Sequence, residues 1–210
     1  MKAVIFDLDG VICLTDEYHY LAWKALADRE GIYFDKVINN KLRGVSRMAS
    51  LDIILERANK KYSQEEKEEM ANYKNEVYKK FLVKMNPNDL SDDVLYTLKT
   101  LKERGFKIAI GSSSKNTKTI LKQLGIIDMF DAISDGTNIT RSKPDPEVFI
   151  KAAEMLNLPV NECYVVEDAY SGIDAAKTGG FKAFGIGDAS KYEKADYQIQ
   201  KLSDLLNIVK

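Results

Sequence analysis

The chain has 210 residues, of which 45% are hydrophobic and 30% are charged, proportions that are ordinary for a globular protein. Its 31 lysines and arginines balance 32 aspartates and glutamates, and this balance favours neither nucleic acid nor an anionic membrane as a partner. No apolar stretch is long enough to cross a membrane, and two cysteines are too few for a disulfide framework. We therefore expect a cytoplasmic protein that binds no nucleic acid and no membrane.

The chain opens with a short apolar run, Ala3 to Phe6, which is followed by Asp7, Asp9 and Gly10. A branched hydrophobic run that ends at a glycine turn predicts a buried strand of a parallel sheet. Open α/β sheets bind their ligands at the carboxyl ends of strands, so both aspartates are candidate site residues. Two like charges this close repel unless a cation or an anion-binding group offsets them. A solvated loop is the alternative for this stretch when it is taken alone.

The segment between Asp16 and Lys84 has helical periodicity and contains no strand candidate. The expected helices span residues 16–30, 35–42, 50–58 and 64–82. This pattern predicts an all-helical cap domain of residues 15–84, inserted into a core of residues 1–14 and 85–210.

Strands and helices alternate after Asn86. The expected strands span residues 106–110, 132–134, 163–166, 183–186 and 197–199. The expected helices are capped by Ser91 and Ser114, begin at Pro146, span residues 170–178, and end the chain at 202–209. This alternation predicts an α/β fold in which a Rossmann-like parallel sheet carries helices on both faces.

Three further motifs follow in order along the core. They are Gly111-Ser112-Ser113-Ser114, Ser142-Lys143-Pro144 and Glu167-Asp168. Together with Asp7-Leu8-Asp9, this ordered set resembles the haloacid dehalogenase superfamily of phosphoryl-transfer enzymes. Each motif is weak alone, whereas four in order are specific. The segments 15–19, 22–26, 44–47 and 114–116 are more specifically similar to the β-phosphoglucomutase family, whereas Arg43 stands where the family has lysine.

The resemblance implies a role for five catalytic residues. Asp7 would be the nucleophile that holds the phosphoryl group as an acyl phosphate, and Asp9 would be the general acid and base. His19 would meet Asp9 when the cap closes, although a lone helical histidine is often only a core or surface residue. Ser112 and Lys143 would offer a hydroxyl and a charge to the phosphoryl oxygens.

The resemblance also implies a Mg²⁺ cofactor. Its ligands would be the side chains of Asp7, Glu167 and Asp168 and the main-chain carbonyl of Asp9. Oxygen ligands at a phosphoryl-transfer site favour Mg²⁺ over zinc. The alternative for Glu167-Asp168 is that the two residues form a solvated loop after a strand. Further residues match the family's substrate-binding positions: Thr15, Trp23, Lys24, Arg43, Gly44, Val45, Ser46, Arg47, Ser114, Lys115 and Asn116.

The implied reaction interconverts glucose 1-phosphate, as its β-D anomer, and glucose 6-phosphate through glucose 1,6-bisphosphate. A bisphosphate needs a second anion site on the cap, for which Arg47 is the candidate. A sugar-phosphate phosphatase is the alternative, because water can attack an aspartyl phosphate and a closing cap would serve either enzyme. A non-catalytic sugar-phosphate-binding protein is disfavoured, because the nucleophile, acid/base, lysine and metal ligands are all present. We expect a monomer.

Overall fold

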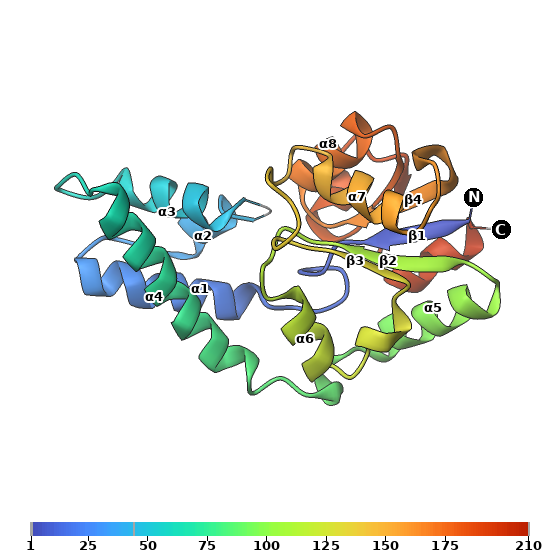
Figure 1. Cartoon of the computed structure of the whole chain (residues 1–210), viewed down its shortest axis with the longest axis horizontal. Helices are drawn as coiled ribbons and strands as arrows, with labels where there is room; N and C mark the ends of the chain where they lie inside the picture. Colours follow the sequence, from blue (N-terminus) through green and yellow to red (C-terminus); the bar gives the residue numbers. More distant parts are fainter. Residues whose placement is uncertain (1, 44, 210) are drawn as a thin grey trace.

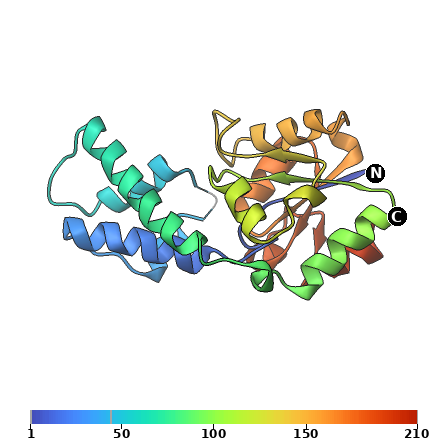
Figure 2. The ribbon, with the colours of Figure 1, turned by 60° about the horizontal axis from the view of Figure 1, so that its bottom comes forward.

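The computed structural model describes residues 2–43 and 45–209, and in it a helical lobe lies beside a lobe built around a sheet (Figure 1). Two chain segments join the lobes, one before α1 and one after α4 (Figure 2). None of the helices in the described ranges is both long and apolar enough to span a membrane.

The sheet lobe, here called the core, has six parallel strands in the order β3-β2-β1-β4-β5-β6. Their bounds are β1 Ala3–Phe6, β2 Lys107–Gly111, β3 Ala132–Ser134, β4 Cys163–Glu167, β5 Lys182–Gly185 and β6 Tyr197–Gln198. Chain order reverses at β1, which pairs with β2 on one side and β4 on the other. Ligands bind at such a reversal, so the carboxyl end of β1 is the expected place for the site.

Alternate residues of β1 face opposite sides of the sheet. Val4 and Phe6 belong to one hydrophobic cluster, whereas Ala3 and Ile5 belong to another. The helices α5 (Asp92–Glu103) and α6 (Thr117–Gln123) contribute to the first cluster, and α7 (Glu147–Met155) and α8 (Tyr170–Thr178) contribute to the second. The predicted parallel sheet with helices on both faces is therefore confirmed.

The helical lobe, here called the insertion, consists of α1 (Asp16–Glu30), α2 (Lys36–Asn40), α3 (Arg47–Leu55) and α4 (Gln64–Leu82). It has a hydrophobic cluster of its own, in which Trp23, Leu51 and Met70 are buried. A separate core supports the predicted cap of residues 15–84, whose boundaries stay a prediction.

Three expectations for helix ends were wrong. Helix α3 begins at Arg47 rather than near Ser50, because the Ser46 side chain accepts a hydrogen bond from the Ala49 amide. Helix α6 follows Asn116 rather than Ser114, whose hydroxyl instead accepts the Asn116 amide. The terminal segment is a 3₁₀ helix, Leu202–Asn207, rather than a longer helix over 202–209.

Candidate active site

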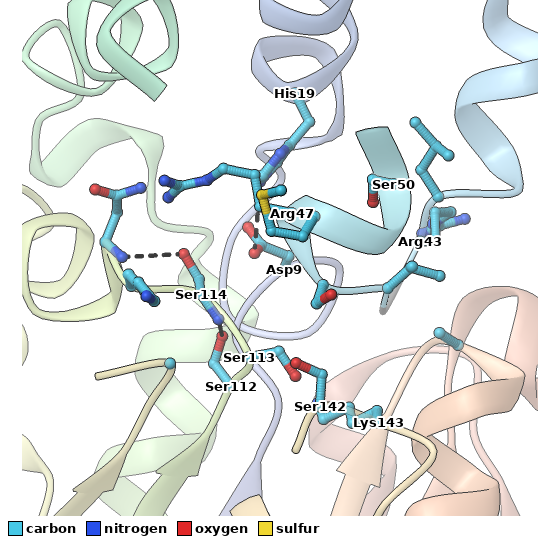
Figure 3. A pocket seen from close by; sticks show the side chains of 18 of the residues that line it. Asp9, His19, Arg43, Arg47, Ser50, Ser112, Ser113, Ser114, Ser142 and Lys143 are labelled. Atoms are coloured by element: carbon cyan, nitrogen blue, oxygen red, sulfur yellow. Dashed lines mark hydrogen bonds and ion pairs between the residues drawn. The ribbon is translucent and has the colours of Figure 1, made fainter. Parts of the chain in front are cut away.

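A cavity of about 550 Å³ lies between the carboxyl ends of the strands and the insertion (Figure 3). The core lines it with residues that include Asp7, Asp9, Ser112, Ser114, Lys115, Asn116, Lys143, Glu167 and Asp168. The insertion lines it with residues that include His19, Trp23, Arg43, Val45, Ser46, Arg47, Ser50 and Lys74. Both lobes therefore contribute side chains to one site.

Asp7 follows β1 directly and is buried at the base of the cavity. The Lys143 ammonium ion-pairs with Asp7 and with Glu167 Oε1, the latter at 2.6 Å. Glu167 Oε2 accepts the Ala169 amide at 2.8 Å, which fixes this carboxylate in place. Burial alone would lower the pKa of Lys143, but Asp7 and Glu167 raise it above its ordinary value. Lys143 therefore stays protonated beside Asp7.

Three buried carboxylates, from Asp7, Glu167 and Asp168, place oxygen atoms within 4.8 Å of one another. Burial, together with the charges of Glu167 and Asp7, raises the pKa of Asp168. A cation that binds the three carboxylates would remove this repulsion, and their hard oxygen donors fit a divalent ion such as Mg²⁺. The acidic motifs that were predicted from separate strands thus form one candidate metal site.

Two glycines let the backbone approach these carboxylates closely. A Cβ atom at Gly172 would lie 1.9 Å from Glu167 Cδ, and one at Gly10 would lie 2.0 Å from Asp168 Oδ2. Gly10 also has φ +91°, a backbone conformation that other residues rarely adopt. Side chains at either position would displace the acidic group.

Asp9 lies between the core and α1. Its Oδ1 accepts a hydrogen bond from the Thr15 hydroxyl, and its Oδ2 lies 3.9 Å from His19 Nε2. Burial and the neighbouring charge of Asp7 raise the pKa of Asp9 to about 7. A carboxyl group with this pKa can both donate and accept a proton near neutral pH.

His19 is oriented by Lys74, a residue of α4 that we did not predict. Lys74 Nζ lies 2.9 Å from His19 Nδ1, and burial lowers the pKa of His19 well below its ordinary value. The imidazole is therefore neutral, and when Lys74 is protonated it accepts at Nδ1 from the ammonium, which puts its own proton on Nε2, facing Asp9. Burial and nearby Arg47 lower the pKa of Lys74 itself to about 7.

The sequence contained a signal for Lys74. It lies four residues after Met70 and four before Tyr78, so it belongs to the buried stripe of α4. Its ammonium lies 4.8 Å from the centre of the Trp23 ring and 4.6 Å from that of Tyr78. A lysine at an apolar position of an amphipathic helix is a reason to look for a functional partner.

Basic groups other than Lys143 also line the cavity. Arg47 reaches it from the start of α3, across from Lys143 (Figure 3), and Lys115 of the loop after β2 is a further lining residue. Within residues 2–43 and 45–209, neither the Arg47 nor the Lys115 cationic group has a carboxylate within 4.0 Å. The more distant charge of Glu76 slightly opposes the fall in the pKa of Arg47. Burial lowers the pKa of Arg47, because removing the charged guanidinium from water costs solvation free energy. An anionic ligand would relieve this cost.

Arg43 connects the two lobes. Its guanidinium pairs with Asp168, with Asp16 at 3.1 Å and with Asp188 at 2.9 Å. Asp16 belongs to the insertion, whereas Asp168 and Asp188 belong to the core. These contacts hold the insertion against the strand ends.

Lys24 and Thr15 are predicted binding residues that do not line the cavity. Lys24 pairs with Asp28 one turn along α1. Thr15 acts through Asp9 rather than by facing the cavity, and Gly44 lies outside the described residues. Besides Lys74, the sequence did not indicate Ser50, which lines the cavity, or Asn75 of α4 as residues of the site.

Comparison with known proteins gives the family. Residues 1–180 match the family described as haloacid dehalogenase-like hydrolase. The chain is 44% identical over 207 residues to the β-phosphoglucomutase of Bacillus subtilis, covering 98% of this chain and 92% of that protein. The chain belongs to the β-phosphoglucomutase family.

A solved structure agrees with this membership. The β-phosphoglucomutase of Clostridium difficile has a TM-score of 0.92 and 41% identity, over 98% of this chain and 93% of that one. A "Phosphorylated carbohydrates phosphatase" of Thermotoga maritima is 29% identical over 224 residues, 100% of this chain and 99% of that protein. The resemblance that was inferred from the motifs is confirmed. The similar proteins include both mutases and a phosphatase.

Proposed function

We propose that this member of the β-phosphoglucomutase family interconverts β-D-glucose 1-phosphate and glucose 6-phosphate through an aspartyl-phosphate enzyme and β-glucose 1,6-bisphosphate. The supporting observation is that one cavity carries two separate cationic sites. Lys143 lies beside Asp7, Arg47 reaches the cavity from the insertion on the opposite side (Figure 3), and Lys115 also lines the cavity. A bisphosphate needs both sites, whereas hydrolysis of a monophosphate needs only the first.

In this proposal Asp7 is the nucleophile. A carboxylate oxygen of Asp7 forms a bond to phosphorus while the bond from phosphorus to the sugar oxygen breaks. Lys143 and the hydroxyl of Ser112 donate to the phosphoryl oxygens. A Mg²⁺ ion held by Asp7, Glu167, Asp168 and the Asp9 carbonyl would offset the charge of two anions that approach each other.

Asp9 moves the proton. It donates to the sugar oxygen that leaves phosphorus, and it later accepts the proton of the hydroxyl that attacks the aspartyl phosphate. The pKa of about 7 suits both directions, since neither protonation state is strongly disfavoured near neutrality. The Thr15 hydroxyl holds one Asp9 oxygen, and His19 of the insertion lies 3.9 Å from the other, near enough to hydrogen-bond to Asp9 after a small approach of the two lobes.

A sugar-phosphate phosphatase is the alternative, and the Thermotoga maritima relative supports it. The two functions differ in whether water or a second sugar hydroxyl receives the phosphoryl group from Asp7. The basic groups of Arg47 and Lys115 favour the mutase, because they can hold the phosphate that is not transferred.

Arg47→Ala tests this choice. Arginine grips phosphate bidentately, and hydrogen bonds to charged groups are worth about 1.5–3 kcal/mol, so mutase efficiency should fall roughly 10- to 100-fold. Hydrolysis of a small aryl phosphate, which has no second phosphate, should barely change. Both rates are measured in one preparation. A parallel loss of both would mean that Arg47 supports folding of the insertion, and no loss of either would place the second anion site elsewhere.

Lys74→Met should separate function from stability. Methionine keeps the length of the side chain but cannot donate to His19, so the imidazole loses its fixed proton position and mutase turnover should fall about 10- to 100-fold. The free energy of unfolding should rise by about 1 kcal/mol, because a buried amine, whether charged or neutral, is replaced by an apolar group. Urea denaturation and turnover measure the two effects, and the exposed Lys80→Met on the same helix is the control. Loss of stability together with activity would contradict the proposed role.

A further inference from the structure

Asn75 lies on α4 behind the cavity, and it does not line the cavity itself. Its Oδ1 accepts two hydrogen bonds, from Arg47 Nη2 at 2.8 Å and from Asn116 Nδ2 at 3.0 Å. Arg47 begins α3 in the insertion, whereas Asn116 is the N-cap residue of α6 in the core. One amide oxygen therefore joins two groups that line the basic side of the cavity from opposite lobes.

The two donors can meet at this oxygen only while the lobes are together. Asn116 is nearly buried, and its backbone amide is already bonded to Ser114, so its side-chain position depends on Asn75. Arg47 uses a single nitrogen, Nη2, for Asn75, and this leaves the rest of its planar fork for an anion. The contact thus orients the guanidinium and leaves its other N–H donors available to an anion.

We propose that Asn75 is a positioning residue: its shared amide oxygen holds Arg47 and Asn116 at a fixed spacing and thereby selects substrates that carry a second phosphate. This inference rests on the proposed mutase function. Asn75 touches no substrate; it acts by fixing two groups whose separation must match a phosphate. Without it, the guanidinium keeps its charge but samples several orientations, so a phosphate that binds there must first order the side chain.

Two variants of Asn75 separate positioning from a structural role. Asn75→Ala removes the acceptor, and its efficiency with β-glucose 1,6-bisphosphate should fall about tenfold, mainly through KM. Asn75→Asp keeps the shape and the acceptor, but its carboxylate would pair with Arg47 and compete with the phosphate. We expect its KM for the bisphosphate to rise more than that of Asn75→Ala.

Hydrolysis of an aryl phosphate should stay within about twofold of the wild-type rate in both variants, since that substrate does not reach the second site. The midpoint of thermal unfolding should barely move, because the freed donors adjoin the cavity and can bind water. Glu69→Ala, an exposed change on the same helix, is the control and should alter neither activity. A structural role predicts the reverse: wild-type behaviour in Asn75→Asp, and equal losses of both activities in Asn75→Ala.

A double variant provides a second readout. If one oxygen orients both groups, Asn75→Ala should raise KM less in an Asn116→Ala background than in the wild-type protein, because Asn75 then has only Arg47 left to position. Additive effects on KM would contradict the proposal. Failure of the proposed function would look different, since the wild-type protein itself would then release phosphate without forming glucose 6-phosphate. Wild-type mutase activity with an unaffected Asn75→Ala variant would contradict the inference on Asn75 alone.

Discussion

Asp7→Asn is expected to abolish mutase turnover and phosphoenzyme formation, lowering the rate by about 10⁴-fold or more. Asparagine has nearly the shape of aspartate, but its neutral amide oxygen is a poor nucleophile and cannot form a stable acyl phosphate. The Lys143–Glu167 pair remains in place, so the ammonium keeps a partner and the fold should be retained.

Intact-protein mass spectrometry after incubation with β-glucose 1,6-bisphosphate measures the phosphoenzyme directly. The wild-type protein should gain the mass of one phosphoryl group, and Asp7→Asn should gain none. Thermal unfolding provides the control for folding. A variant that keeps a substantial fraction of the wild-type rate would rule out Asp7 as the nucleophile.

Asp9→Asn is expected to slow phosphoryl transfer between sugars by roughly 10²–10⁴-fold, the usual scale for a lost general acid/base. The asparagine carbonyl can still accept from Thr15, so the loop keeps its position and substrate KM should change far less. The rate that is measured is the single-turnover transfer from phosphoenzyme to glucose 1-phosphate.

The leaving group gives Asp9 a matched control. An aryl phosphate with an acidic phenol leaves without help from a proton, so formation of the phosphoenzyme from it should be much less sensitive to Asp9→Asn. A sugar phosphate needs that proton. Equal losses with both substrates would mean that Asp9 holds the structure of the site rather than moving protons.

Much of the core could be predicted, because the same apolar runs that indicate its strands also end in the polar residues that form the site. The apolar runs of β1, β2 and β4 each end in polar residues, and parallel strands bring those ends together. Asp7, Ser112 and Glu167 therefore met in space as expected, although they are far apart in sequence. Helices α1, α4 and α8 have the predicted bounds, because apolar periodicity and turn residues agree there.

The remainder of the site depends on contacts between helices, which local patterns do not encode. The resemblance placed Lys24 in the site, but Lys24 pairs with Asp28 one turn along α1 and does not line the cavity. Lys74 and Asn75 lie in the middle of a charged helix, and only the approach of α1, α3 and α6 gives them partners. Periodicity gives the face on which a residue lies, whereas the partner depends on tertiary structure.

The most direct test of the proposed function is to follow both products at once. The protein is incubated with Mg²⁺, β-D-glucose 1-phosphate and a trace of β-glucose 1,6-bisphosphate, and ³¹P NMR resolves glucose 6-phosphate from free phosphate. The mutase proposal predicts that glucose 6-phosphate accounts for nearly all of the substrate consumed, with free phosphate accumulating only slowly. Release of free phosphate in step with substrate consumption, without glucose 6-phosphate, would contradict it.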